Sequence, residues 1–259
     1  MKRPSRNSSL TIARYTVVEA LRSGLPWLAS AGMLAILGLA SFLSRVAIAD
    51  SAALQVLASG ALLRAGAVFL IAAHVVASVT REANDKSLEL ALVLPVSRSS
   101  YYIGKLAGFA CAGALLATFY CLPLLLWAKP GDVAAWWLSL VLETGFVAAA
   151  ALFLASAMAQ AVAALAAVAG LYLLGRSISA IQAIAGAPQA GDSFSAVAVR
   201  WFVDALALLL PRLDAATRSD WLLYGAPAGG EFAAAALGLG LYILLLAAAG
   251  LFDISRRNL

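Results

Sequence analysis

The chain has 259 residues, of which 63% are hydrophobic and only 12% are charged, and its mean hydropathy is +0.93. Soluble globular domains are about half apolar and about a quarter charged, so this composition excludes a soluble domain and indicates an integral membrane protein. The net charge of +5 would suggest a nucleic-acid partner in a soluble chain, but we expect none here, because in a membrane protein the distribution of charge matters more than its sum.

The first 24 residues are basic. Five basic residues stand here against one acid, Glu19: Lys2, Arg3, Arg6, Arg14 and Arg22. Apolar residues recur at helical spacing at Leu10, Ala13, Val17 and Leu21. We therefore predict a disordered cytoplasmic tail over residues 1–9, followed by a basic amphipathic helix on the inner leaflet, where each Lys or Arg near anionic lipid contributes roughly 1 kcal/mol.

Residues 25–259 are predicted to form an all-α transmembrane domain with six spans. The expected spans cover residues 25–43, 61–79, 106–127, 134–159, 161–181 and 232–252. Residues 51–60 are apolar but short, and we expect them to form part of an external connection. Pro123 is expected to kink the third span, because proline cannot donate a backbone hydrogen bond.

A second polar interruption separates the fifth and sixth spans. Residues 195–210 carry Arg200 and Asp204 one turn apart and end before Pro211, which is too short for a span. We predict an external amphipathic or re-entrant helix there, followed by a short helix over residues 221–224 that Ser219 and Asp220 cap.

The longest charged interruption runs from residue 80 to 105, between the second and third spans. Its charged residues lead into an apolar stripe formed by Leu88, Ala91 and Leu92. Pro95 ends that pattern, and Ser97 is placed to cap the next helix. The pattern predicts a short amphipathic helix outside the bilayer, whose apolar face requires lipid or a partner protein.

This interruption resembles the first cytoplasmic loop of ABC-2 type transporter permeases. That family shows an R/D-E pair, G-T-L-E, a leucine run, P-x-S-R and then G-K at the start of the next span. The corresponding residues here are Arg81-Glu82, Lys86-Ser87-Leu88-Glu89-Leu90, Leu94-Pro95-Val96-Ser97-Arg98 and Gly104-Lys105, with Lys86-Ser87 in place of Gly-Thr.

The resemblance implies the membrane subunit of an ATP-binding cassette exporter in a bacterial inner membrane. The loop would then be a coupling helix that docks on a separate ATPase. Its implied coupling residues are Arg81, Glu82, Lys86, Ser87, Leu88, Glu89, Ala91, Leu92 and Pro95. The implied partners are two ATPase copies, which bind Mg-ATP, and a second copy of this permease or a related one.

The arrangement of basic residues predicts that both termini are cytoplasmic, because Lys and Arg favour the inner side of span ends. The basic residues on that side are Lys2, Arg3, Arg6, Arg14, Arg22, Arg81, Lys86, Arg98, Lys105, Arg256 and Arg257.

Motifs for chemistry are missing from the sequence. Gly104-Lys105 lacks the rest of a phosphate-binding loop, and the sequence contains no H-E-x-x-H, C-x-x-C or G-x-S-x-G. We expect no cofactor and no enzyme active site in this chain, and His74 is interpreted as a packed residue. The alternative function is a stand-alone membrane scaffold or intramembrane enzyme, for which the charged loop would be a solvated connection.

Three charges fall inside the predicted spans: Arg64, Glu143 and Arg176. Counted from the inner face at ~1.5 Å per residue, all three lie at ~22–26 Å, in the outer third of a ~30 Å apolar core. Because the fourth and fifth spans are joined by a tight turn, Glu143 and Arg176 should form an ion pair. Either the pair fixes that hairpin, or the three residues form a polar layer, with Arg64, that gates or contacts cargo.

Overall fold

The computed structural model describes residues 6–47, 50–85, 97–158, 160–186, 194–225 and 229–256. These residues are almost all helical, and none of them is in a β-strand. The helices are α1 (Arg6–Arg22), α2 (Leu25–Val46), α3 (Ser51–Asn84), α5 (Arg98–Cys121), the 3₁₀ helix η1 (Leu122–Leu126), α6 (Pro130–Ala157), α7 (Ala161–Ala185), α8 (Phe194–Leu209), α9 (Leu213–Ala216), α10 (Trp221–Tyr224) and α11 (Gly229–Arg256).

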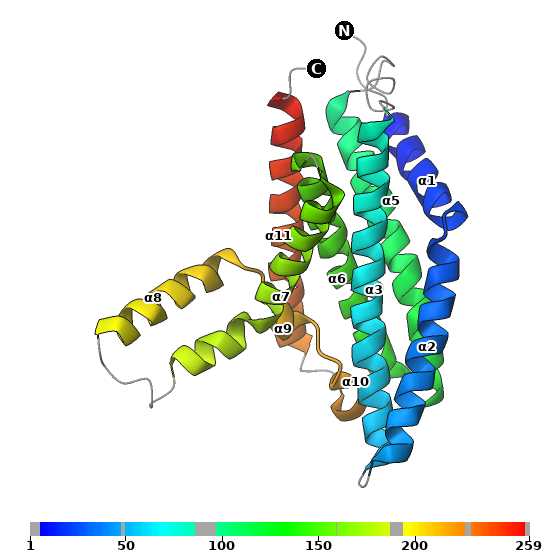
Figure 1. Ribbon diagram of the computed structural model, residues 1–259, viewed down its shortest axis with the longest axis vertical. Coiled ribbons are helices and arrows are strands. Elements are labelled where there is room, and N and C mark those ends of the chain that lie inside the picture. The colour runs from blue at the N-terminus through cyan, green and yellow to red at the C-terminus, as the bar shows by residue number, and fades with distance from the viewer. Residues whose placement is uncertain are drawn as a thin grey trace.

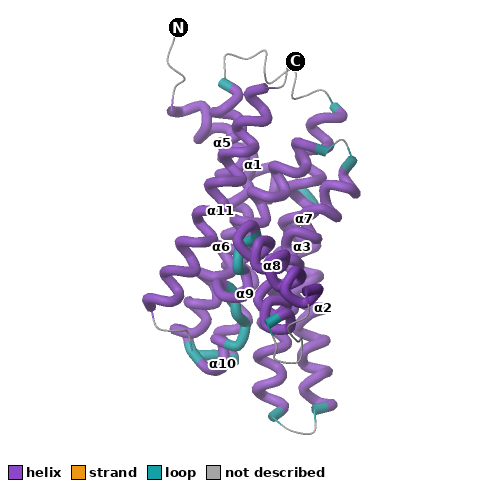
Figure 2. Tube along the Cα trace, turned by 90° about the vertical axis from the view of Figure 1, so that its left-hand side faces the viewer, coloured by secondary structure: helices purple, strands orange, loops and turns teal. Residues whose placement is uncertain are grey.

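Six segments of the described chain are long and apolar enough to cross a membrane: α2, α3, α5 with η1, α6, α7 and α11. This confirms the predicted six-span, all-α class and supports a multi-pass membrane protein. In Figure 1 the start of α1, the end of α3, the start of α5 and the end of α11 lie together at the top. We call this the loop end, and the lower end, where α10 lies, the α10 end; Figure 2 shows the same division from the side.

The core of the bundle is α6, the most buried of the six segments. Its middle carries four consecutive alanines, residues 148–151, which are all buried although they point to different sides of the helix. Small side chains on every face let neighbouring helices approach closely. In contrast, α2 and α11 lie outside with few of their residues buried, as expected for helices that face lipid.

Glycines on α5 form the seam with α1. A Cβ atom added at Gly104 would lie 2.8 Å from the carbonyl oxygen of Ser9, and one at Gly108 would lie 2.9 Å from that of Ala13. Backbone atoms cannot move aside as side chains can, so this approach requires glycine. Gly104 and Gly108 therefore allow α1, which is not one of the six membrane-spanning segments, to pack closely against α5.

The predicted N-terminal helix is present as α1, but it begins at Arg6, so residues 6–9 are helical and do not belong to the disordered tail that was expected. The surface that α1 buries also differs from the one expected. Thr16 and Ala20 are buried against the bundle, whereas Leu10 and Leu21 of the predicted apolar stripe are exposed. The periodic stripe alone could not reveal the seam, because small polar and apolar residues fit equally well against glycines.

The second span begins earlier than expected, which corrects the assignment of residues 51–60 to a connection. These residues form the first turns of α3, a helix of 34 residues. Gly60 lies inside this helix, where a glycine lowers helix stability by about 1 kcal/mol relative to alanine. The Leu222 side chain of α10 packs over Gly60, and this packing compensates for that loss.

The third span starts and ends as the local sequence indicates. The Ser97 side chain accepts a hydrogen bond from the backbone N–H of Ser100 at 3.2 Å, which confirms the predicted cap. At the other end, the α-helix gives way to the 3₁₀ helix η1, which contains Pro123. The amphipathic helix with the apolar stripe was predicted within residues 86–96. These residues are outside the part of the chain that the structure describes, so that prediction stays untested.

A helical hairpin projects sideways from the bundle in Figure 1, formed by the second half of α7 and by α8. The predicted helix over residues 195–210 is therefore present. Its two charges hold the hairpin together: Arg200 Nε donates to the Ala185 carbonyl and Gln182 Nε2 donates to Asp204 Oδ1, both at 2.9 Å. The predicted short helix over residues 221–224 is also present, as α10, but Asp220 makes no side-chain capping bond.

Candidate functional site

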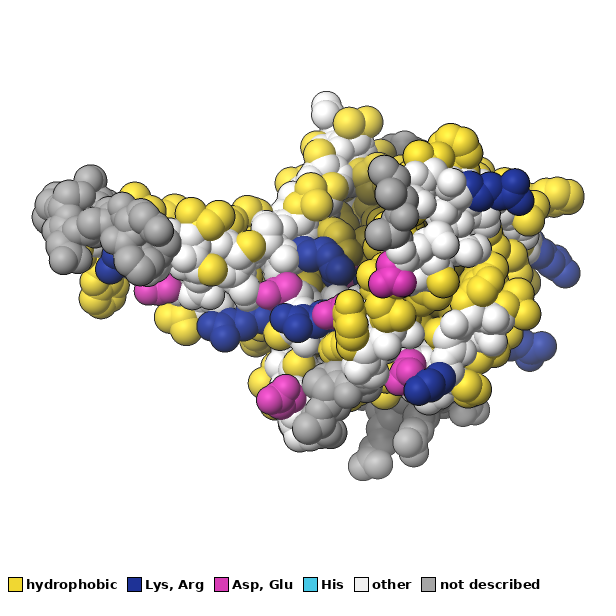
Figure 3. Space-filling model, turned by 90° about the horizontal axis from the view of Figure 1, so that it is seen from below, with side chains coloured by type: hydrophobic (Ala, Val, Ile, Leu, Met, Phe, Trp, Pro, Cys, Tyr) yellow, Lys and Arg dark blue, Asp and Glu magenta, His cyan; other side chains and the backbone are white. Residues whose placement is uncertain are grey.

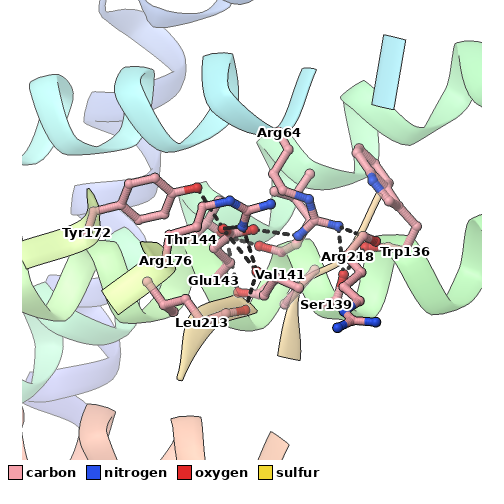
Figure 4. Close-up of polar contacts among 12 residues, drawn as sticks. Arg64, Trp136, Ser139, Val141, Glu143, Thr144, Tyr172, Arg176, Leu213 and Arg218 are labelled. Atoms are coloured by element: carbon pink, nitrogen blue, oxygen red, sulfur yellow. Dashed lines mark hydrogen bonds and ion pairs between the residues drawn. The ribbon is translucent and has the colours of Figure 1, made fainter. Parts of the chain in front are cut away.

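A fully buried carboxylate, that of Glu143, lies at the centre of a cluster of charges from three helices (Figure 4). Arg64 of α3 donates from Nη1 to Glu143 Oε2 at 2.5 Å, and Arg176 of α7 donates from Nη1 to Oε1 at 3.1 Å. The three intramembrane charges singled out by helical counting are thus brought together. The expected Glu143–Arg176 pair is present, and Arg64 makes the shorter contact with the carboxylate.

Neutral groups complete the cluster. Tyr172 Oη donates to Glu143 Oε1 at 2.8 Å, and the Ser139 hydroxyl accepts from Arg64 Nη2 at 2.9 Å. The Thr217 hydroxyl accepts from Arg176 Nη1 at 2.8 Å and lies 3.4 Å from Glu143 Oε1. Thr217 follows α9, so the cluster also holds the segment between α8 and α10 against the bundle.

The cluster carries one more positive than negative charge, and its two cations differ in exposure. The Arg64 side chain is 1% exposed and its guanidinium lies 5.1 Å from the centre of the Trp136 ring. The Arg176 side chain is 32% exposed. The carboxylate therefore compensates for the buried cation, while the excess positive charge of Arg176 is presented at the edge of the cluster.

The α10 end, seen from below in Figure 3, shows Lys, Arg, Asp and Glu side chains gathered near the middle of the face, with apolar side chains around them. The charged groups of Arg218 and Asp220 lie 4.0 Å apart, and about half of each side chain is exposed. Arg218 also links this face to the buried cluster, because its carbonyl oxygen accepts from Arg64 Nη2 at 3.4 Å. The polar layer thus extends toward the surface at this end.

A second charge cluster lies at the loop end and joins α1, α3 and α5. Glu82 accepts a hydrogen bond from Tyr101 Oη at 2.5 Å and pairs with Lys105. Glu19 accepts from Arg81 Nη2 at 2.7 Å and lies 3.5 Å from Lys105 Nζ. Because Arg81 and Glu82 precede residues 86–96 and Tyr101 and Lys105 follow them, the cluster fastens both ends of that segment to each other.

The carboxyl group of Glu19 is strongly influenced by this cluster. Burial by itself would raise its pKa, but the charge of Lys105, a hydrogen bond from Ser78 Oγ at 2.9 Å and the guanidinium of Arg81 together lower the pKa below its ordinary value. Glu19 is therefore held in its charged form, as the bond between α1 and the two spans requires.

Two of the predicted coupling residues, Arg81 and Glu82, lie in the last turn of α3. Within the chain, Arg81 pairs with Glu19 and Glu82 pairs with Lys105. The other predicted coupling residues lie outside the described residues: Lys86, Ser87, Leu88, Glu89, Ala91, Leu92 and Pro95.

Sequence reasoning overlooked several members of the two clusters, among them Glu19, Tyr172 and Thr217. A signal existed for two of these three. Glu19 is the single acid in a basic segment, and Tyr172 precedes Arg176 by four residues, which places both on one face of a helix. Thr217 gave no local signal, because it lies in a connection whose position depends on the whole bundle.

Within the described ranges, no group of three His, Cys, Asp or Glu side chains is placed to hold a metal ion. Both oxygens of the Glu143 carboxylate already accept hydrogen bonds, from Arg64, Arg176 and Tyr172. A scan against models of protein families and a search of curated proteins found no match to this chain.

Proposed function

We propose that this protein is the permease subunit of an ABC-2 type exporter. The observation that carries the proposal is the cluster at the loop end, where Glu82 contacts Tyr101 and Lys105 across the base of residues 86–96. Because its two ends are fixed to each other, a displacement of the loop moves the attached spans instead of only deforming the loop. This is the mechanical property that a coupling loop requires, and it adds to the resemblance in the sequence of residues 80–105.

The proposed transmission path is α3, which contributes to both clusters. Arg81 belongs to the loop-end cluster and Arg64 to the Glu143 cluster, 17 positions apart (81 − 64), or about 25 Å along one helix. A helix moves nearly as a rigid body, so displacement of its loop end also displaces Arg64. We propose that ATPase closure shifts α3 and loosens the contact between Arg64 and Glu143, which would release the segment that carries Thr217.

The proposed assembly contains two permease subunits, this chain with a second copy or with a related permease, and two ATPase subunits, which bind Mg-ATP. The hairpin of α7 and α8 supports this assembly. It leaves the bundle with Trp201, Phe202, Leu208 and Leu209 largely exposed, so its apolar surface is covered by lipid or by the second permease. In this proposal the loop end faces the cytoplasm of a bacterial cell, both termini lie there, and the chain itself holds no cofactor.

The first test of the function is whether an adjacent reading frame encodes a Walker-motif ATPase, and the second is co-expression of this chain with such an ATPase. The wild-type chain should co-purify with that ATPase, and Leu88→Asp should abolish the association while leaving membrane insertion intact. Leu88→Met is the matched control, because it keeps an apolar side chain of similar volume and should retain the ATPase. Co-purification of the Asp variant with normal transport would contradict docking through this loop, and the absence of any associated ATPase would favour a stand-alone scaffold.

A further inference from the structure

We propose that the chain binds one anionic phospholipid in a groove between α3 and the elbow that joins α1 to α2. The groove has a volume of about 280 Å³. Its lining includes Ser23 and Leu28 on one side and Leu70, Ala73, His74 and Arg81 on the other. The inference needs only a chain that spans a membrane, so it is independent of the transport proposal.

The groove is polar at one end and apolar at the other. Arg81 and His74 are seven positions apart on α3, or about 10 Å along the helix, with Arg81 nearer the loop end. Leu28 and Leu70 line the apolar part. An amphiphile whose charged group lies beside Arg81 and whose chain runs toward Leu70 matches this division.

The donors at the polar end suit a phosphate group. The Arg81 side chain is 60% exposed and uses Nη2 for Glu19, which leaves other N–H groups of its guanidinium directed to no acceptor among the described residues. A guanidinium has five N–H groups and binds phosphate oxygens in pairs. His74 also lines the groove, and its Nε2 is buried with no hydrogen-bond partner in the part of the chain that the structure describes.

The charge at the mouth favours an anionic headgroup over a zwitterionic one. The lining residues include no carboxylate, and the nearby Glu19 is already paired with Arg81 and Lys105. The ammonium of a choline headgroup would therefore find no counter-charge, whereas Arg22, exposed in the last turn of α1, adds a further cation beside the elbow.

The dimensions of the groove favour a lipid over a small soluble ligand. Pockets that enclose a whole small molecule measure roughly 300–1,000 Å³, so this groove holds only part of a larger molecule. The rest of that molecule would lie along α2, whose apolar side chains Trp27, Leu28 and Leu34 are largely exposed. In a membrane-spanning chain that surface is in contact with acyl chains.

A second groove of about 200 Å³ on the other side of the elbow provides an internal comparison. It lies between α2 and α5, and its lining residues, which include Leu21, Leu116 and Phe119, carry no charge. The same elbow therefore offers one charged and one uncharged groove, and only the charged one should distinguish headgroups.

The test is native mass spectrometry of the full chain purified in detergent and titrated with phosphatidylglycerol or phosphatidylcholine of identical acyl chains. We expect one tightly retained phosphatidylglycerol and about tenfold weaker retention of phosphatidylcholine. Arg81→Gln should remove this preference. Ala73→Phe, which fills the groove without changing a charge, should lower retention of both lipids. Arg14→Gln, at an exposed position on α1 outside the groove, is the matched control and should retain the preference.

Three outcomes would overturn the proposal. Equal retention of the two lipids by the wild-type chain would show that the groove does not discriminate between anionic and zwitterionic headgroups. An equal loss in Arg14→Gln and Arg81→Gln would show attraction to the basic surface as a whole. Displacement of phosphatidylglycerol by millimolar glycerol phosphate would show a site for a soluble anion. Because Ala73→Phe leaves the loop-end cluster intact, its result is informative even if Arg81→Gln folds poorly.

Discussion

Glutamine at position 143 provides the sharpest test of the buried cluster. The substitution keeps the size of the side chain but removes the one carboxylate that pairs with Arg64 among the described residues, and the Arg64 side chain is 1% exposed. Breaking a buried ion pair by removing one partner costs about 3–5 kcal/mol, because the other charge stays buried without compensation. Removing Arg176 should cost less, about 1–3 kcal/mol, because Glu143 keeps Arg64 at 2.5 Å.

The assay is thermal unfolding of the purified chain in a mild detergent. At about 2–4 °C per kcal/mol for a chain of this size, Glu143→Gln should lower the midpoint by about 6–20 °C and Arg176→Gln by less. Glu231→Gln, at an exposed position, is the matched control and should leave the midpoint unchanged. Replacing both Arg64 and Glu143 by methionine should recover much of the loss, because apolar residues often substitute for a buried pair at little cost. An unchanged midpoint in Glu143→Gln would refute this reasoning.

The remaining predictions concern charge exchange, the seam and pH. Exchanging the pair, Glu143→Arg with Arg176→Glu, should fail to restore stability or transport, because the new arginine would face Arg64; recovery in either assay would contradict the contact in Figure 4. Gly108→Leu should push α1 off α5 and speed trypsin cleavage in α1, whereas Gly38→Leu, where the side chain would meet no neighbour, should not; equal cleavage rates would argue against the seam. Because the folded-state pKa of Glu19 is lowered, its contribution to stability is present above the ordinary value of 4.5 and is lost as the pH falls through the folded value. The thermal midpoint of the wild type should therefore fall more steeply below pH 4.5 than that of Glu19→Gln, and parallel curves would count against the pairing.

Much of this molecule follows from the sequence alone, because some properties depend only on position along a helix. Apolar blocks of sufficient length predict the six spans, since each must bury its backbone hydrogen bonds within the bilayer. A fixed rise per residue places Arg64, Glu143 and Arg176 at one height whatever the packing. Ser97 and Pro123 mark helix boundaries through their own backbone chemistry, and the structure has boundaries at both.

Other properties were decided only by the tertiary structure, because they depend on which faces of different helices meet. The sequence gives the height of Glu143 but not that Arg64 is its nearer partner, which follows from the rotation of α3 about its axis. Likewise, Glu82 was expected to reach a partner protein, yet Tyr101 and Lys105 lie beside it once α5 packs along α3. Rotation and neighbour choice are set by the side-chain packing of the whole bundle, and no local pattern in the sequence encodes them.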